Sequence, residues 1–327
     1  MTPPNLPNDP ALTSGTPFTG VVANRYRIER EIADGGMATV YLAHDLTRDV
    51  HVALKAPKPE LVLQLGAARF AREIRIATRL QHPHIVPVLD TGVAGGVPYY
   101  VMPFVEGETL EERLARTGPL PMDDAISIAS DVLEGLSYAH GLGFVHRDVK
   151  PSNVLLANGC ALLADFGIAR TADTTDTRNL TDAGFALGTA EYMSPEQAAG
   201  ESHIDRRSDL YSLGCVLYEM LTGTPPFTAP TARAVMARHF VDPVASIRTH
   251  REALPLTLEA AVMKALAKIP DDRFADAASF RAALNDLTPR EVAVSETRSV
   301  PRRPRIWMVL AVGGLVVAGA ALIWRLQ

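Results

Sequence analysis

Residues 146–167 read HRDVKPSNVLLANGCALLADFG, and this stretch carries more recognisable chemistry than any other part of the chain. It combines two carboxylates, Asp148 and Asp165, with one carboxamide, Asn153. Oxygen ligands of this kind suit Mg²⁺, which is a hard cation, and a carboxylate can also serve as a general base. Lys150 adds a positive charge beside Asp148. The set predicts a phosphoryl-transfer site, because that reaction needs bound metal, an oriented hydroxyl and neutralised charge.

The composition limits the classes of protein that this chain can represent. Its 327 residues, 47% of them hydrophobic, suffice for one large domain or two ordinary ones. A net charge of −5 argues against a nucleic-acid partner, which would favour a basic surface. Cys160 and Cys215 are isolated in the sequence, so we expect two reduced, buried thiols and no disulfide framework.

The two ends of the chain differ in composition from its middle. Residues 1–22 are expected to form a disordered tail, because the first twenty contain several prolines and no apolar run. No basic stretch followed by an apolar one appears there, so the tail does not resemble a secretory signal. Residues 289–305 are polar, contain prolines and arginines, and are predicted to be a juxtamembrane linker.

An uncharged run, IWMVLAVGGLVVAGAALIW, occupies residues 306–324. As a helix it would be roughly 28 Å long, close to the thickness of a bilayer's hydrocarbon core. Trp307 and Trp324 lie at its ends, where interfacial aromatic residues are expected. The run therefore predicts a transmembrane helix, and the alternative is a buried helix at the end of a soluble domain.

The charges that flank this run predict its orientation. Arginines cluster before it and only Arg325 follows, so the N-terminal side is expected in the cytoplasm and residues 325–327 outside it. The predicted location is the cell membrane, with a single pass. Gly314 and Ala318 lie on one face of the run and could allow two copies to pair as a homodimer. The preceding arginines are Arg298, Arg302, Arg303 and Arg305.

Residue periodicity in the middle of the chain changes from strand-like to helical. Short β-rich runs are expected near residues 26–32, 39–43, 51–55 and 99–105, with one helix near 70–80 between them. Beyond residue 107 the pattern is helical, with a helix over 126–140 that Gly141 stops. A second, apolar almost all round, covers 208–223, with Ser208 as its cap and Gly223 at its end. The fold class predicted is α+β, with a small β-rich lobe followed by a larger α-rich lobe.

The spacings H-R-D-x-x-x-x-N and D-F-G in residues 146–167 resemble the catalytic and metal-binding loops of protein kinases. The resemblance is to bacterial eukaryotic-like (Hanks-type) serine/threonine kinases and covers about residues 23–288. It implies a bilobal kinase fold, ATP with Mg²⁺ or Mn²⁺ as cofactors, and proteins with Ser or Thr as substrates. It makes Asp148 the base and Lys150 the group that neutralises the γ-phosphoryl charge. Asn153 and Asp165 become the metal ligands.

The same resemblance assigns a nucleotide-covering loop to IADGGMATVY, residues 32–41. Ile32, Gly35, Gly36 and Val40 are its expected ATP contacts. Alanines replace the outer two glycines of the family pattern, and a plain β-hairpin turn is the alternative interpretation of this segment.

Lys55 closes V-A-L-K and matches the lysine that holds the α- and β-phosphates, with Ala53 beside it. Glu73, on the expected helix, matches the glutamate that orients this lysine. In YVMPFVEG, Met102 corresponds to the gatekeeper, and the main chain of Pro103 and Val105 would face adenine. Proline fits this position because only its carbonyl is needed.

The resemblance also assigns roles in the activation segment and its supports. Glu196 of MSPE would pair with Arg273, and Asp209 would anchor the catalytic loop. Arg147 would read a phosphate on Thr181 by charge-assisted hydrogen bonds. Every threonine of this segment could otherwise be an ordinary solvated loop residue. Thr189 matches the threonine that docks beside the base.

Three functions remain open from sequence alone. The first is a membrane-tethered protein kinase that also phosphorylates its own activation segment. The second is a pseudokinase scaffold that binds nucleotide or partners without turnover, supported by the altered glycine loop. The third is a kinase of small molecules, against which the full activation segment argues.

Overall fold

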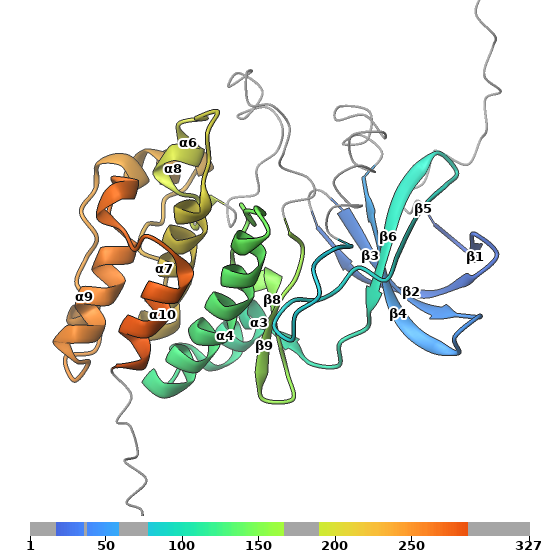
Figure 1. Ribbon diagram of the computed structural model, residues 1–327, viewed down its shortest axis with the longest axis horizontal. Helices are drawn as coiled ribbons and strands as arrows, with labels where there is room; N and C mark the ends of the chain where they lie inside the picture. Colours follow the sequence, from blue (N-terminus) through green and yellow to red (C-terminus); the bar gives the residue numbers. More distant parts are fainter. Residues whose placement is uncertain (1–17, 36–37, 59–77, 167–189, 287–327) are drawn as a thin grey trace, which may run out of the picture. The chain divides into compact units, whose positions relative to one another are not determined.

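The computed structural model describes residues 18–35, 38–58, 78–166 and 190–286 (Figure 1). The chain divides into two compact units, Met1–Thr288 and Pro289–Gln327, and every described residue belongs to the first. Several sequence predictions concern residues outside the described ranges, and these remain predictions. They are residues 1–17 of the tail, Gly36, the helix near 70–80 up to residue 77, Glu73, Thr181, Thr189, the linker 289–305, the membrane segment 306–324 and the end 325–327.

The N-terminal lobe is built on an antiparallel sheet of six strands in the order β1-β2-β3-β4-β6-β5 (Figure 1). The strands predicted near 39–43, 51–55 and 99–105 are present as β3, β4 and β6, each shifted or extended by a few residues. The six strands are β1 Val21–Val22, β2 Tyr26–Asp34, β3 Ala38–Asp45, β4 Val50–Pro57, β5 Asp90–Ala94 and β6 Val97–Pro103.

Residues 18–22 do not belong to a disordered tail, so that part of the prediction was wrong. Phe18 is buried, and its ring lies 6.2 Å from that of Tyr41 and 5.9 Å from that of Tyr99. Val22 is also buried and belongs to β1. One aromatic residue in a proline-rich stretch gave no periodic signal, although burying it stabilises the fold by about 1.5–3 kcal/mol.

Strand register separates the two faces of this sheet. Tyr41, Leu54 and Tyr99 belong to the hydrophobic core of the lobe. Lys55 lies directly opposite Tyr100 on β6. Because side chains alternate along a strand, Lys55 and Tyr100 lie on the face opposite this core. One face of the sheet thus packs on the hydrophobic core of the lobe, and the other carries Lys55 and Tyr100.

A second sheet of three short strands, β7-β8-β9, follows the N-terminal sheet in the sequence. Its strands are β7 Glu108–Thr109, β8 Val154–Ala157 and β9 Cys160–Leu163. The sequence predicted only helical structure beyond residue 107, and that was wrong here because strands this short carry almost no periodicity. Gly107 approaches β8 so closely that an added Cβ would lie 2.2 Å from the Leu156 carbonyl oxygen.

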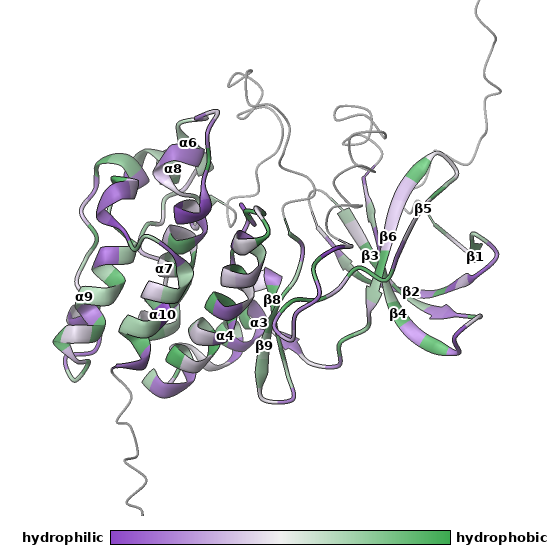
Figure 2. Cartoon of the chain, in the orientation of Figure 1, coloured by the Kyte–Doolittle hydropathy of each residue, from purple (hydrophilic) through white to green (hydrophobic). Residues whose placement is uncertain are grey.

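The C-terminal lobe is largely helical, and hydrophobic residues cover the inward faces of its helices (Figure 2). The predicted helix ending at Gly141 is present as α4. The lobe contains α3 Leu110–Thr117, α4 Met122–Gly141, α6 Pro195–Ala198, α7 Arg206–Thr222, α8 Ala232–Val241, α9 Leu256–Ala265 and α10 Ala277–Asn285, with short 3₁₀ turns η2 Pro151–Asn153, η3 Ile247–Thr249 and η4 Pro270–Asp272.

Helix α7 is the central helix predicted over residues 208–223, and nearly all of its residues are buried. Its cap is Asp205, whose side chain accepts the Arg207 N–H, so the predicted cap Ser208 is wrong and lies inside the first turn. Asp is as good a cap as Ser, and the apolar run alone does not mark the first turn. Gly223 ends the helix in the left-handed region at φ 86°, as predicted.

Two further findings concern the cysteines and membrane crossing. Cys215 is buried as expected, but Cys160 is exposed at the start of β9, next to the turn at Gly159, so that prediction was wrong for Cys160. Helices of the described ranges are too short or too polar to cross a membrane.

Candidate active site

The catalytic loop holds Asp148, Lys150 and Asn153 together. The Asn153 amide nitrogen donates to the Asp148 carbonyl oxygen at 2.8 Å and to its Oδ2 at 3.0 Å. Lys150 Nζ lies 3.0 Å from the same Oδ2. The Asp148 carboxylate is therefore fixed by an amide and an ammonium, and it remains 20% exposed, so an incoming hydroxyl can reach it.

Asp209, on α7, holds the backbone of this loop by hydrogen bonds. Its carboxylate accepts the N–H groups of His146 at 2.8 Å and Arg147 at 2.7 Å. His140 Nε2 lies 2.7 Å from the same carboxylate. Arg147 has a φ of 65°, which an L-residue adopts only at a cost. The two backbone hydrogen bonds offset that cost and hold Asp148 at the end of the strained turn.

Asp165 meets the sheet through two hydrogen bonds, one to each carboxylate oxygen. Lys55 Nζ donates to Oδ2 at 2.5 Å, and the Tyr100 hydroxyl donates to Oδ1 at 2.6 Å. Burial acts to raise the pKa of Asp165, but the Lys55 ammonium and the Tyr100 hydroxyl outweigh it, so the pKa lies below its ordinary value. The carboxylate is thus ionised at neutral pH, as a metal ligand must be.

The donor set fits Mg²⁺ bound together with nucleotide phosphates. The side-chain amide nitrogen of Asn153 donates both of its hydrogen bonds to Asp148. The side-chain oxygen, Oδ1, is therefore the atom of this amide that can bind a cation. Asp165 supplies carboxylate oxygens. No group of three or more His, Cys, Asp or Glu residues in the described part of the chain could hold a metal alone. Mg²⁺ sites typically use one or two protein carboxylates and complete the coordination shell with phosphates and water.

Four predicted nucleotide contacts, Val40, Ala53, Lys55 and Met102, lie on the face of the N-terminal sheet opposite its core. Met102 lies opposite Ala53 across β4 and β6, and Pro103 is the last residue of β6. Val40 lies opposite Lys55 on β3 and is half-buried. These pairings place four of the predicted residues on neighbouring strands.

The ends of the nucleotide-covering loop are also described. Ile32 is half-buried on β2. Gly35 donates its N–H to the Ala38 carbonyl at 3.0 Å, which joins the end of β2 to the start of β3. Val105 is half-buried just beyond β6.

His146 packs rather than titrates at physiological pH. Its ring lies 4.5 Å from that of Phe166, and its Nε2 lies 2.9 Å from the Ala164 carbonyl oxygen. Burial lowers the pKa of His146, which keeps the ring neutral. This side chain therefore links the catalytic loop to the segment that carries Asp165.

The end of the activation segment is held by an ion pair. Arg273 donates to both oxygens of Glu196, at 2.7 and 2.8 Å, and both residues are buried. Gln197 donates its side-chain N–H to the Arg147 carbonyl at 2.8 Å. Gln197 was not predicted from the sequence, where its only signal is the S-x-x-Q capping box that it forms with Ser194.

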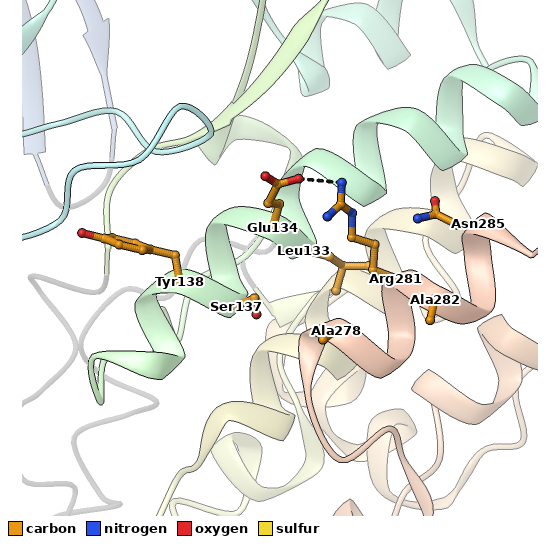
Figure 3. Close-up of a pocket in the computed structure, with 8 residues that line it drawn as sticks. All are labelled: Leu133, Glu134, Ser137, Tyr138, Ala278, Arg281, Ala282 and Asn285. Carbon is orange, nitrogen blue, oxygen red and sulfur yellow. Dashed lines mark ion pairs between the residues drawn. The ribbon is translucent and has the colours of Figure 1, made fainter.

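A pocket of about 440 Å³ lies elsewhere, between α4 and α10 (Figure 3). Its walls include Ser137, Ala278 and Ala282, and Glu134 pairs with Arg281 across it at 2.5 Å. None of the predicted site residues lines it. Volume alone is a poor guide to this active site, whose residues are distributed over two lobes.

A six-stranded antiparallel sheet followed by a largely helical lobe, with the H-R-D and D-F-G loops described above, defines the protein kinase class of fold. The chain belongs to the protein kinase family, whose domain model matches residues 26–283. The resemblance predicted from the catalytic-loop and D-F-G motifs is thereby confirmed.

Among its relatives is the serine/threonine-protein kinase PknB of Mycolicibacterium smegmatis, 44% identical over 271 residues, which are 80% of this chain and 43% of that protein. PknB of Mycobacterium leprae is 42% identical over 270 residues, again 80% of this chain and 43% of that protein. The serine/threonine-protein kinase Pkn3 of Myxococcus xanthus is 39% identical over 292 residues, 86% of this chain and 53% of that protein. The chain thus spans about half the length of the curated relatives it matches.

Proposed function

We propose that this protein transfers the γ-phosphoryl group of ATP to Ser and Thr hydroxyls of other proteins, with a divalent metal, Mg²⁺ or Mn²⁺. One observation carries the proposal: the Asp148 carboxylate is accessible and held by Lys150 and Asn153, as a general base for a hydroxyl should be. The names of the bacterial relatives support protein as the substrate class.

Each residue has a separate task in this proposal. Asp148 orients the acceptor hydroxyl and takes its proton, while Lys150 neutralises charge on the transferred group. Asn153 and Asp165 would hold the metal ion, which supplies positive charge against that of the phosphates. Lys55 would hold the α- and β-phosphates from the sheet, and its contact with Asp165 supports a position close to the proposed metal ligand.

The adenine end is assigned to the strand β6 and the residues after it. Met102 would contact the base as gatekeeper, and main-chain groups of Pro103 and Val105 would face its edge. Support comes from the register that pairs Met102 with Ala53 and Pro103 with Val52, since these pairs put the segment beside the Lys55 strand.

The direct test is transfer from γ-labelled ATP in the presence of Mg²⁺, using the full chain and a generic protein substrate. Label is expected on the substrate and on the kinase itself. Label on neither would favour a pseudokinase scaffold, and label on small molecules alone would favour the third class. Lys55→Met should abolish the signal, because the phosphates would lose their cationic partner.

Activation is proposed to depend on phosphorylation of Thr181, which lies outside the described residues. A phosphothreonine carries about −1.5 to −2 charges, enough to order a segment against the Arg147 side chain. The Arg147 backbone is held by Asp209 and Gln197, which supports a fixed position for such a partner. Thr181→Ala is therefore expected to lower transfer to other proteins, whereas Thr174→Ala should not. Mass spectrometry that finds fully active enzyme with no phosphate on Thr181 would exclude this role.

Residues 23–288 are proposed to be a cytoplasmic kinase domain, joined by the linker 289–305 to a membrane helix at 306–324. The full chain is then expected in the membrane fraction, and a chain truncated after Arg305 in the soluble fraction. Recovery of both in the soluble fraction would contradict the anchor.

Gly314 and Ala318 are proposed to allow pairing of two copies, so Gly314→Leu with Ala318→Leu should reduce crosslinking in membranes. Unchanged crosslinking would leave the helix as an anchor only.

A further inference from the structure

Tyr100 is a buried polar residue that the proposed mechanism leaves without a task. It is 4% exposed, on the strand β6, and its hydroxyl donates to Asp165 Oδ1 at 2.6 Å. Lys55, which contacts the other oxygen of Asp165, is its direct neighbour across β4 and β6. Two adjacent strands thus present two donors to one carboxylate.

These two bonds determine how the Asp165 carboxylate is turned. A single donor would allow the carboxylate plane to rotate about its Cβ–Cγ bond, whereas donors on separate oxygens hold it. The backbone of Asp165 is itself in the left-handed region, at φ 62°, which costs free energy for a residue with a Cβ. The Tyr100 and Lys55 bonds stabilise this conformation.

The hydroxyl does not exclude a metal from the oxygen that it binds. A carboxylate offers about four lone-pair sites, and one hydrogen bond on Oδ1 occupies only one of them. Lys55, by contrast, would turn toward the phosphates once nucleotide is present. The hydrogen bond from Tyr100 to Asp165 then persists, because moving Asp165 away would leave the buried Tyr100 hydroxyl without a partner.

We propose that the Tyr100 hydroxyl is a positioning group that holds the metal-binding carboxylate of Asp165 in its ligating orientation and so lowers the metal concentration that the enzyme needs. This inference rests on the proposed kinase function. It concerns orientation and not packing, because removing the oxygen leaves in place the ring, which lines a small cavity together with Ile85, Met102 and Phe166.

The test compares Tyr100→Phe with wild type in the full chain. Phenylalanine keeps the ring and removes only the hydroxyl. Tyr99→Phe is the matched control, since Tyr99 is the buried neighbour on the same strand but faces the hydrophobic core. Mn²⁺ binding is measured by electron paramagnetic resonance in the presence of the β,γ-imido analogue of ATP, which cannot be turned over. The thermal midpoint of each variant is measured alongside.

We expect Tyr100→Phe to weaken Mn²⁺ binding by about 10-fold, the lower end of what a hydrogen bond to a charged group contributes. Tyr99→Phe should leave it unchanged. In transfer assays the half-saturating Mg²⁺ concentration should rise by a similar factor in Tyr100→Phe, while the rate at saturating Mg²⁺ returns to near that of wild type.

Other outcomes overturn the inference. Equal Mn²⁺ affinity in wild type and Tyr100→Phe would mean that the hydroxyl does not position the ligand. Tighter binding would mean that it competes with the metal. Equal weakening in both tyrosine variants would indicate general loosening of the sheet. If the wild type bound no Mn²⁺ with the analogue, the proposed function itself would fail, which is a distinguishable result.

Discussion

Asp148→Asn is expected to lower phosphoryl transfer by about 10²–10⁴-fold, the usual contribution of a general base, and to leave nucleotide binding nearly unchanged. Asparagine cannot take the hydroxyl proton at neutral pH, although it has almost the same shape as aspartate. The contacts of Asp148 go to Asn153 and Lys150 in its own loop, and the predicted adenine contacts lie on the sheet. Binding and turnover should therefore separate in this variant.

The measurement is initial transfer rate from labelled ATP, with the dissociation constant of a fluorescent ATP analogue determined in parallel. Asp131→Asn is the matched control. Asp131 is 21% exposed, against 20% for Asp148, and its carboxylate accepts the Ala161 N–H, which an asparagine oxygen can also do. Wild-type turnover in Asp148→Asn would refute the assignment of the base, and so would an equal loss in both variants.

Asp209→Asn should destabilise the fold by about 3 kcal/mol and also reduce transfer. Two backbone N–H groups, of His146 and Arg147, point at separate oxygens of this buried carboxylate. An asparagine amide would turn its own N–H₂ toward one of those donors and leave it unsatisfied. The strained turn at Arg147 would lose half of its support, and the base next to it would lose its fixed position.

Urea denaturation gives the change in the free energy of unfolding, and the transfer assay gives the effect on the loop. Asp205→Asn serves as the control, because it is the same chemical change at the start of the same helix, and asparagine caps a helix as well as aspartate does. It should cost no more than about 1 kcal/mol. The anchoring role would be contradicted by an Asp209→Asn protein as stable and active as the control.

Residues that act close together in sequence were the easiest to predict. Asp148, Lys150 and Asn153 lie within one short loop, so their spacing alone indicated a shared task. Asp165 followed from a second local motif. Contacts between distant elements were predictable only through family resemblance, as with Glu196 and Arg273, which are 77 positions apart.

Tyr100 shows why other contacts were missed. In the sequence it is one residue of the largely apolar run YYVMPFV. Only the pairing of Tyr100 with Lys55 across β4 and β6 shows that these two side chains lie on the same face of the sheet. Register is a property of two strands, so a single strand's sequence does not specify it. The strands β7, β8 and β9 were missed for another reason, since two to four residues cannot establish a period.

The close approach of Gly107 to Leu156 restricts where the two lobes can bend. A side chain at 107 would collide with the β8 backbone, and β7 pairs with β8 directly after it. The chain from Gly107 onward therefore belongs mechanically to the helical lobe, and Pro103 belongs to the sheet lobe. Residues 104–106 connect these two segments. Since Val105 is proposed to contact adenine, nucleotide binding and the angle between the lobes would depend on each other. A ligand that stiffens this tripeptide would also limit how far the enzyme can open.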